Sequence, residues 1–156
     1  MKKIRFLTKL KKEGKLELVE ASEEIKESYI KKSESSLVSS KILLENEKLE
    51  ESIALSYYSM YHMLTSLLFQ VGIKCENHAC SIILMKELFS LDNSDISSAK
   101  SERIDKQYYT DFHITKEDVK DAVKNAEDFN SRLLEFISKI SHKDIEYYRK
   151  RFKDIS

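Results

Sequence analysis

The stretch SYYSMYHMLTSLLFQVG, residues 56–72, is among the most apolar runs in the chain, yet it contains three tyrosines, a histidine and a row of serines. One face of a helix through this segment is almost entirely apolar, and its spacing is typical of a buried core stripe. We therefore predict a buried helix that begins near Glu47 and stops at Gly72. The predicted core stripe comprises Ile53, Tyr57, Met60, Leu64, Leu67 and Val71.

Two other faces of the same helix carry polar side chains in a regular pattern. Tyr58 and His62 are four residues apart and therefore share one face. His62 is either a histidine at the edge of the core or a functional group. A second row steps by threes and fours, which is the spacing of a helix seam. Either this row is solvated or it contacts another helix, in the same chain or across a dimer two-fold axis. The row comprises Ser52, Ser56, Ser59, Met63, Ser66 and Gln70.

The composition favours long helices in a single domain. The chain has 156 residues, no proline and only two glycines, Gly14 and Gly72. Sheet-rich folds need many more turn residues than this. There is no apolar run long enough to span a membrane, and the lysine-rich start lacks the apolar segment of a signal peptide. Two cysteines do not make a disulfide framework, so we expect a cytoplasmic protein.

The remaining helices are predicted from caps and apolar periodicity. Ser22 is the expected N-cap of a helix that runs to about Glu45, and Asn77 of one that runs to about Phe89. Residues 95–111 form another helix, and Thr115 with Asp118 forms a capping box for a helix over 116–140. Ile25, Tyr29, Leu37 and Leu44 are expected on the inner face of the first of these.

We therefore predict an all-α, antiparallel up-and-down bundle of about five helices, with short extra helices at the termini. A basic N-terminal segment covers residues 1–18 and includes a short helix over 3–12. The bundle covers 19–141. A short C-terminal helix lies within 142–156.

Positive charge is concentrated at both ends of the chain. Residues 1–16 contain seven Lys or Arg and one Glu, and the tail from 142 has two more basic than acidic residues. The ends either contact phosphates or form solvated, partly frayed termini. The segment YYRKRFK, 147–153, is typical of single-stranded RNA binding but also of an ordinary amphipathic last helix.

The segment after Gly72 contains possible metal ligands. Cys75, His78 and Cys80 supply only three ligands, and their spacing is not that of a standard zinc finger. We expect no metal and no cofactor. His78 stands near a helix N-terminus, where an anion can bind, or is simply a helix-start residue.

The segment YYSMYHMLTSLLFQVGIKCENH resembles the central hairpin of HEPN domains, particularly the small stand-alone prokaryotic ones. The segments YIKKSESSLVSSKILL, SERIDKQYY and KEDVKDAVKNAEDF agree in order and spacing, and the resemblance covers about residues 20–140. It implies a helical bundle that commonly dimerises and a role with nucleotides or RNA. Many members are metal-independent ribonucleases, often toxins paired with a small nucleotidyltransferase.

The ribonuclease members use an arginine followed about four to six residues later by a histidine. Arg103 matches the arginine, but Tyr108 occupies the place of the histidine and His113 lies well beyond it. A tyrosine with a pKa of about 10 is a poor base at neutral pH. Tyr109 matches the tyrosine of a branch without established chemistry. Because the partner enzyme can modify a tyrosine beside the histidine in paired systems, Tyr108 and Tyr109 are candidate acceptors.

Three functions follow from this resemblance. The first is a homodimeric nucleotide- or RNA-binding component of a HEPN/nucleotidyltransferase system of the toxin–antitoxin type, without an intact ribonuclease motif. Arg103 would bind phosphate there, and the side chains that shape its site would be Tyr58, His62, His78, Tyr108 and Tyr109. The second is a metal-independent endoribonuclease toxin in which His62, His78 or His113 replaces the missing histidine. The third is a non-enzymatic helical dimerisation scaffold.

Overall fold

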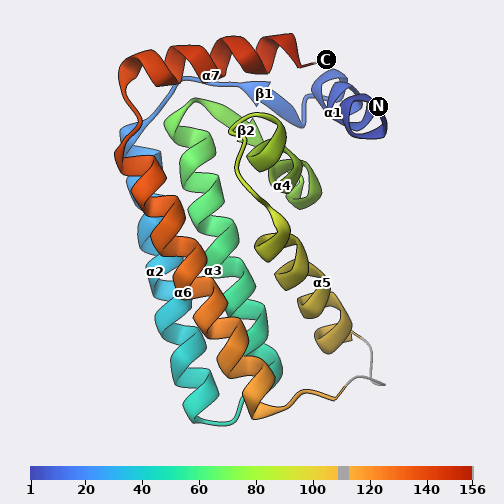
Figure 1. Ribbon diagram of the computed structural model, residues 1–156, viewed down its shortest axis with the longest axis vertical. Helices are drawn as coiled ribbons and strands as arrows, with labels where there is room; N and C mark the ends of the chain where they lie inside the picture. Colours follow the sequence, from blue (N-terminus) through green and yellow to red (C-terminus); the bar gives the residue numbers. More distant parts are fainter. Residues whose placement is uncertain (109–112, 156) are drawn as a thin grey trace.

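Seven helices and two short strands are found in residues 1–108 and 113–155, the part of the chain described by a computed structural model (side chains of 105–108 excepted; Figure 1). This arrangement confirms the predicted all-α bundle. The helices are α1 (Lys2–Lys12), α2 (Glu23–Glu45), α3 (Leu49–Gln70), α4 (His78–Glu87), α5 (Ser94–Tyr108), α6 (Lys116–Ser138) and α7 (His142–Asp154). The strands are β1 (Leu16–Leu18) and β2 (Ile73–Cys75).

Side-chain caps set the helix starts that the sequence predicted. The Ser22 hydroxyl accepts a hydrogen bond from the Ile25 amide at 3.0 Å, at the start of α2. Asn77 caps α4 in the same way, and Thr115 and Asp118 form the predicted capping box of α6. These bonds satisfy amide groups that have no partner inside the helix.

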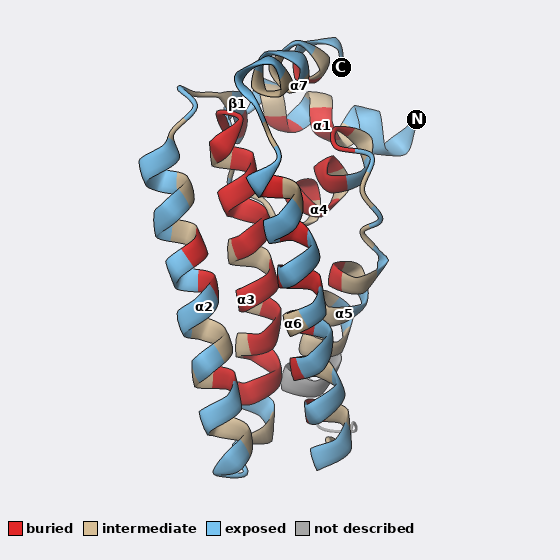
Figure 2. Cartoon of the chain, turned by 60° about the vertical axis from the view of Figure 1, so that its left-hand side comes forward, coloured by how far each residue is buried: buried red, intermediate tan, exposed pale blue. Residues whose placement is uncertain are grey.

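Helix α3 is the central element, and its neighbours α2, α6 and α5 pack around it. Figure 2 shows that buried residues follow α3 along its whole length, whereas α2 and α6 are buried mainly on one side. All members of the predicted core stripe on α3 are at most 2% exposed. The apolar face of α6 is buried against it, through Val119, Val123, Ala126, Phe129, Leu133 and Ile137.

The row of serines on α3 forms a contact within the chain. Ser40 and Ser52 each donate a hydroxyl hydrogen bond to the other's backbone carbonyl, and Ser33 and Ser59 do the same. We call the five buried residues Ser33, Ser40, Ser52, Ser56 and Ser59 the serine seam. All five are at most 2% exposed, so the alternative of a solvated row is wrong. The seam is also not available to a second protomer, because it is buried within one chain.

One predicted inner-face residue of α2 is misplaced. Ile25 is 38% exposed, while Ile30 and two seam serines are the buried residues of this helix. Ile25 lies in the first turn of α2. The other three predicted inner-face residues are half-buried and pack inward: Tyr29 stacks on Phe69 of α3, and Leu37 and Leu44 pack against the core.

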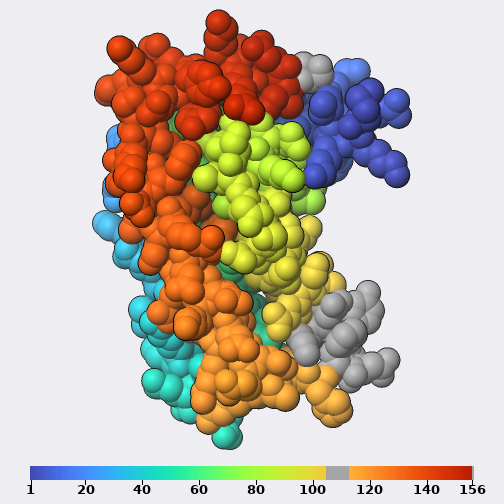
Figure 3. Space-filling model, viewed as in Figure 1, coloured from blue at the N-terminus to red at the C-terminus, as the bar shows by residue number. Residues whose placement is uncertain are grey.

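The terminal segments pack on one end of the bundle. Leu16 pairs with Cys75, and Leu18 with Ile73, in an antiparallel β1–β2 ribbon that the sequence analysis did not predict. Leu7 and Leu10 of α1 are buried, so the alternative of a frayed N-terminal segment is wrong. Helix α7 crosses the same end, and its side chains lie beside those of α1 there (Figure 3).

Candidate functional site

Three helices bring together a group of aromatic rings, imidazoles and one guanidinium. Helix α3 supplies four residues from two adjacent turns, α4 supplies its first residue, and α5 supplies the arginine. Since α4 and α5 both pack on α3, residues distant in sequence become neighbours (Figure 1). We call this group the aromatic–arginine cluster. It comprises Tyr57, Tyr58, Tyr61, His62, His78 and Arg103.

The Arg103 guanidinium lies against two tyrosines of α3. Its Nη1 donates to the Tyr58 hydroxyl at 3.3 Å. Its Cζ lies 5.3 Å from the ring centres of both Tyr57 and Tyr58, which is within the range of cation–π attraction. These contacts hold the planar guanidinium in place while Arg103 stays partly exposed. An oriented guanidinium is well suited to bidentate binding of a phosphate.

The His78 ring is fixed by two tyrosines. Its Nδ1 lies 2.8 Å from the Tyr57 hydroxyl oxygen, and its ring stacks on Tyr61 with centroids 3.7 Å apart and planes 16° from parallel. Within the described residues, Nδ1 is the hydrogen-bond partner of the buried Tyr57 hydroxyl. We assign the proton of this bond to the Tyr57 hydroxyl, because this buried group has no other hydrogen-bond acceptor among the described residues; Nδ1 then accepts the bond, and Nε2 of the neutral imidazole carries the hydrogen.

Burial and nearby positive charge keep the cluster's imidazoles neutral. Burial lowers the pKa of His78, and Arg103 and Lys100 lower it further. Burial also lowers the pKa of His62, with a smaller contribution from Lys32. Burial raises the pKa of Tyr57, which therefore remains a protonated donor. At neutral pH the cluster is thus a cation with neutral donors and aromatic faces.

His62 connects the cluster to α2. Its ring lies 6.4 Å from Tyr58 and 5.9 Å from Tyr29, and Tyr29 stacks on Phe69. Its Nδ1 is buried and, among the described residues, has no hydrogen-bond partner. His62 is therefore a half-buried ring at the edge of the cluster.

A family model describing the HEPN domain matches residues 26–140, which is most of the chain. This chain belongs to the HEPN domain family. It is also similar to the "UPF0332 protein PH1297" of Pyrococcus horikoshii, with 45% identity over 53 residues. That match spans 34% of this chain and 37% of the relative, so the chain covers about a third of the relative's length.

Two residues singled out in the arginine motif cannot be placed in this HEPN domain. The side chain of Tyr108 and the whole of Tyr109 lie outside the described residues. His113 is exposed beside a hollow formed by the start of α3, with Glu50 and Glu51 among its lining residues. Its described surroundings are therefore different from those of Arg103.

The two cysteines of this HEPN domain lie at the end of β2 and in the first turn of α4. The Cys75 thiol donates to the Asn77 carbonyl at 3.3 Å, and Cys80 is fully buried. Hydrogen bonding with the Cys80 thiol, together with a bond from Ser81, lowers the pKa of Cys75 to about 7. In the described part of the chain, no three metal-ligating side chains form a cluster.

Sequence reasoning underestimated two tyrosines. Tyr57 was assigned to the core stripe, and Tyr61 was not singled out, yet Tyr57 hydrogen-bonds the His78 ring and Tyr61 stacks on it. The available signal was their i, i+4 spacing beside Tyr58 and His62.

In the part of the chain that the structure describes, no helix combines the length and apolar character required to cross a lipid bilayer.

Proposed function

We propose that this HEPN domain is a nucleotide- or RNA-binding component of a HEPN/nucleotidyltransferase system of the toxin–antitoxin type, without an intact ribonuclease motif. The observation that carries the proposal is the placement of Arg103 over Tyr57 and Tyr58 and beside a neutral His78. Family membership adds the expectation of a nucleotide or RNA ligand.

The cluster matches the chemistry of a nucleotide in three respects. The Arg103 guanidinium is a bidentate phosphate donor held by its tyrosine contacts. The Nε2 hydrogen of His78 is a second donor, and it is neutral, so it adds no repulsion toward Arg103. Partly exposed aromatic rings such as Tyr58 and Tyr61 give a base a surface on which to stack.

A second candidate function is a metal-independent endoribonuclease with His78 as the replacement base. The observation that favours it is the contact of both His78 and Arg103 with Tyr57. A base must present an unprotonated nitrogen to the substrate hydroxyl. In this arrangement the bare nitrogen, Nδ1, is occupied by the Tyr57 hydroxyl, so the geometry favours binding over cleavage.

A purely structural dimerisation scaffold has less support. Its expected assembly surface included the row of serines, and those side chains are buried inside one chain. A homodimer formed through another surface remains part of the proposal, as does a nucleotidyltransferase partner that modifies Tyr108 or Tyr109. Mass spectrometry of protein co-expressed with such an enzyme would reject the modification if no nucleotide adduct were found.

The first test is binding of a fluorescent nucleoside 5′-monophosphate to wild type and Arg103→Ala. We expect the substitution to weaken binding by about tenfold or more, because a charge-assisted bidentate contact is lost. Arg103→Lys should restore only part of the affinity, since an ammonium lacks the planar fork. Arg132→Ala removes an exposed arginine that pairs with Asp95, and it serves as the control.

The alternative is decided by an RNA cleavage assay in EDTA. Binding without cleavage supports the proposal. Cleavage that disappears in both Arg103→Ala and His78→Gln would establish the ribonuclease instead. Equal affinity of wild type and Arg103→Ala would reject the cluster as the nucleotide site.

A further inference from the structure

Two basic segments at opposite ends of the sequence form one surface. The Nζ of Lys11 in α1 donates to the Phe152 carbonyl of α7 at 2.8 Å and also to the Ile155 carbonyl. The same ammonium lies 4.3 Å from the centre of the Phe152 ring. Lys11 thereby joins α1 to α7 across the end of the bundle. We call the surface formed by α1 and α7 the basic end.

The basic end holds a large share of the molecule's positive charge. Helix α1 contains six Lys or Arg and no acidic residue, and α7 contains five Lys or Arg and three acidic residues. The two helices therefore carry a net charge of about eight positive. Because the whole chain has 27 basic and 27 acidic residues, the rest is negative by the same amount. The neutral chain is strongly polarised.

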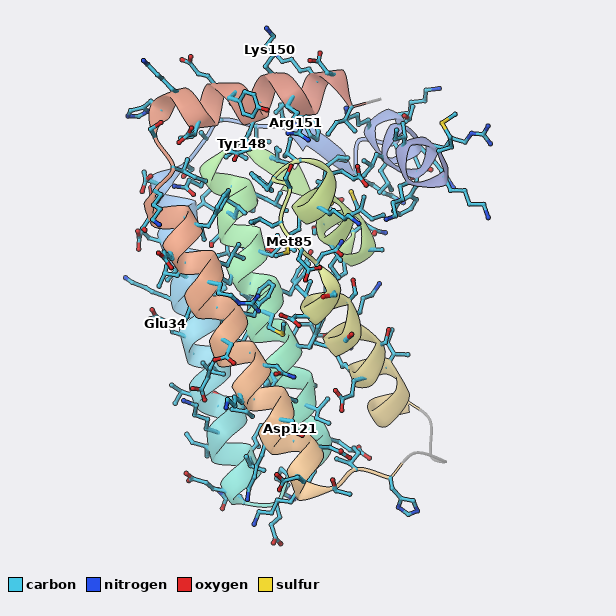
Figure 4. The ribbon with its side chains drawn as sticks, in the orientation of Figure 1. Glu34, Met85, Asp121, Tyr148, Lys150 and Arg151 are labelled. Carbon is cyan, nitrogen blue, oxygen red and sulfur yellow. The ribbon has the colours of Figure 1, made fainter. Side chains whose placement is uncertain are left out.

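Most of these cations are directed to solvent. Seven exposed lysines and arginines of α1 and α7 form no ion pair with any of the described residues. Lys9 and Lys15, in contrast, both pair with Glu13. Lys150 extends away from the bundle above α7 (Figure 4). A cation without an acidic partner is available to a phosphate at little desolvation cost. The seven are Lys2, Lys3, Arg5, Lys12, Lys143, Lys150 and Lys153.

The apolar groups of the basic end favour a nucleic acid over a membrane surface. A helix that binds a bilayer needs a free apolar face, but Leu7 and Leu10 of α1 are buried in the protein core, which leaves Ile4 as its exposed large apolar side chain. On α7, Tyr147 is 56% exposed, and its hydroxyl accepts a hydrogen bond from Arg151 Nη1 at 3.4 Å. An exposed ring among cations is a stacking platform for an unpaired base.

The basic end is connected to the aromatic–arginine cluster at the start of α4. The Glu76 amide, two residues before His78, donates to the Lys15 carbonyl at 3.1 Å. The charge of Lys11 also acts on the Cys80 thiol in the first turn of α4. The first turn of α4, which carries His78, therefore lies beside α1 and the segment that follows it.

We propose that the basic end binds the phosphate backbone of a single-stranded nucleic acid, one nucleotide of which occupies the aromatic–arginine cluster. This inference deepens the proposed function and relies on it for the nucleotide at the cluster. It identifies the ligand as a polymer: a mononucleotide would use the cluster alone, whereas a strand would use both surfaces.

The test compares two variants with the same change in charge. The basic-end variant has glutamine in place of Lys3, Lys12, Lys150 and Lys153. The control variant has glutamine in place of four exposed lysines outside α1 and α7, namely Lys48, Lys86, Lys120 and Lys124. Binding of a fluorescein-labelled 12-nucleotide RNA is followed by anisotropy over a range of salt concentrations. Circular dichroism verifies that both variants are folded.

We expect the basic-end variant to lose about tenfold or more in RNA affinity. The slope of log affinity against log salt should fall by about 0.7 for each phosphate contact removed. Its affinity for the mononucleotide should not change, and the control variant should behave as wild type. Such a result would show that position, and not net charge, determines binding.

The inference is overturned if the basic-end variant and wild type share the same affinity and salt slope, or if the control variant loses as much. Preferential binding of wild type to phosphatidylserine vesicles over RNA would also overturn it. Mononucleotide binding that depends on Arg103 would leave the proposed function intact in either case. Salt-dependent RNA binding without any mononucleotide binding would instead support the basic end and reject the cluster.

Discussion

The side chain of His78 acquires its chemical character from two tyrosines of another helix. Tyr57 determines which ring nitrogen carries the hydrogen, and Tyr61 determines the ring plane. Burial and Arg103 then keep the ring neutral by lowering its pKa. The sequence identified His78 as a polar residue at a helix start, but its neighbours make it a neutral donor beside a fixed guanidinium.

The lowered pKa values of His62 and His78 predict how stability depends on pH. Both histidines bind a proton less readily in the folded than in the unfolded chain, so acidification favours unfolding. The stabilisation is complete above the unfolded pKa of about 6.5 and is lost as pH falls through the folded values. We expect the free energy of unfolding in urea to decrease from pH 7.5 to pH 5.5.

The matched variants are His78→Gln, His62→Gln and His142→Gln. The first two should flatten the pH dependence, since each removes one proton-linked group. His142 is exposed at the start of α7, and its replacement should preserve the wild-type slope. A slope equal in all four proteins would contradict the assignment.

At the scale of the element, α3 combines a core helix with a polar seam. Its aromatic and aliphatic residues fill the centre of the bundle, while its serines exchange hydrogen bonds with α2. Small side chains let the two backbones approach, and their hydroxyl groups are satisfied by the partner's carbonyls. The helix period could be read from the sequence, but the identity of the partner helix could not.

Ser59 is the residue that tests this seam. Its hydroxyl oxygen accepts a hydrogen bond from Asn130 Nδ2 at 2.8 Å and donates to the Ser33 carbonyl at 2.7 Å. Ser59→Ala leaves these buried groups without their partner, which should cost about 1–3 kcal/mol of unfolding free energy. Thermal and urea denaturation measure the loss.

The control is Ser131→Ala on the exposed side of α6, which should change stability by less than about 0.5 kcal/mol. If Ser59→Ala were no less stable than this control, the seam would contribute only space and no hydrogen-bond energy. A dimer-seam role would require Ser59→Ala to change the oligomeric state without lowering the stability of the protomer.

At the scale of the whole molecule, the two ends of the chain are held together by contacts to backbone carbonyls. Arg149 Nη1 of α7 donates to the carbonyls of Val19, Val71 and Gly72, at 2.7, 3.0 and 3.1 Å. Lys11 of α1 binds the last carbonyls of α7. Helices α1 and α7 are therefore fastened to the bundle and to each other, which is what assembles the basic end.

The glycines give a matched pair that tests this attachment. Gly72 and Gly14 both have a positive φ, 78° and 73°. A β-carbon at Gly72 would collide with the Arg149 guanidinium and the Val19 carbonyl, whereas nothing lies within 4 Å of one at Gly14. Gly14→Ala should cost only the backbone strain, about 1–2 kcal/mol, and Gly72→Ala should cost clearly more.

Urea denaturation gives the two free energies, and hydrogen exchange shows where the structure opens. In Gly72→Ala, amide protection should fall first in α7 and β1. Equal losses of stability in the two variants would mean that the Arg149 contacts contribute nothing measurable to the attachment.

The amino-acid sequence by itself determined the helical class, the caps at Ser22, Asn77 and Thr115, and the core stripes of α3 and α6. These are local properties, because capping and periodicity depend on residues a few positions apart. It also supplied the resemblance to HEPN domains. Only the tertiary structure decided which surfaces meet: the serine seam against α2, Arg103 over the tyrosines, and α1 beside α7. Those contacts join residues 12 to 144 positions apart, and their partners are fixed by packing and not by local spacing.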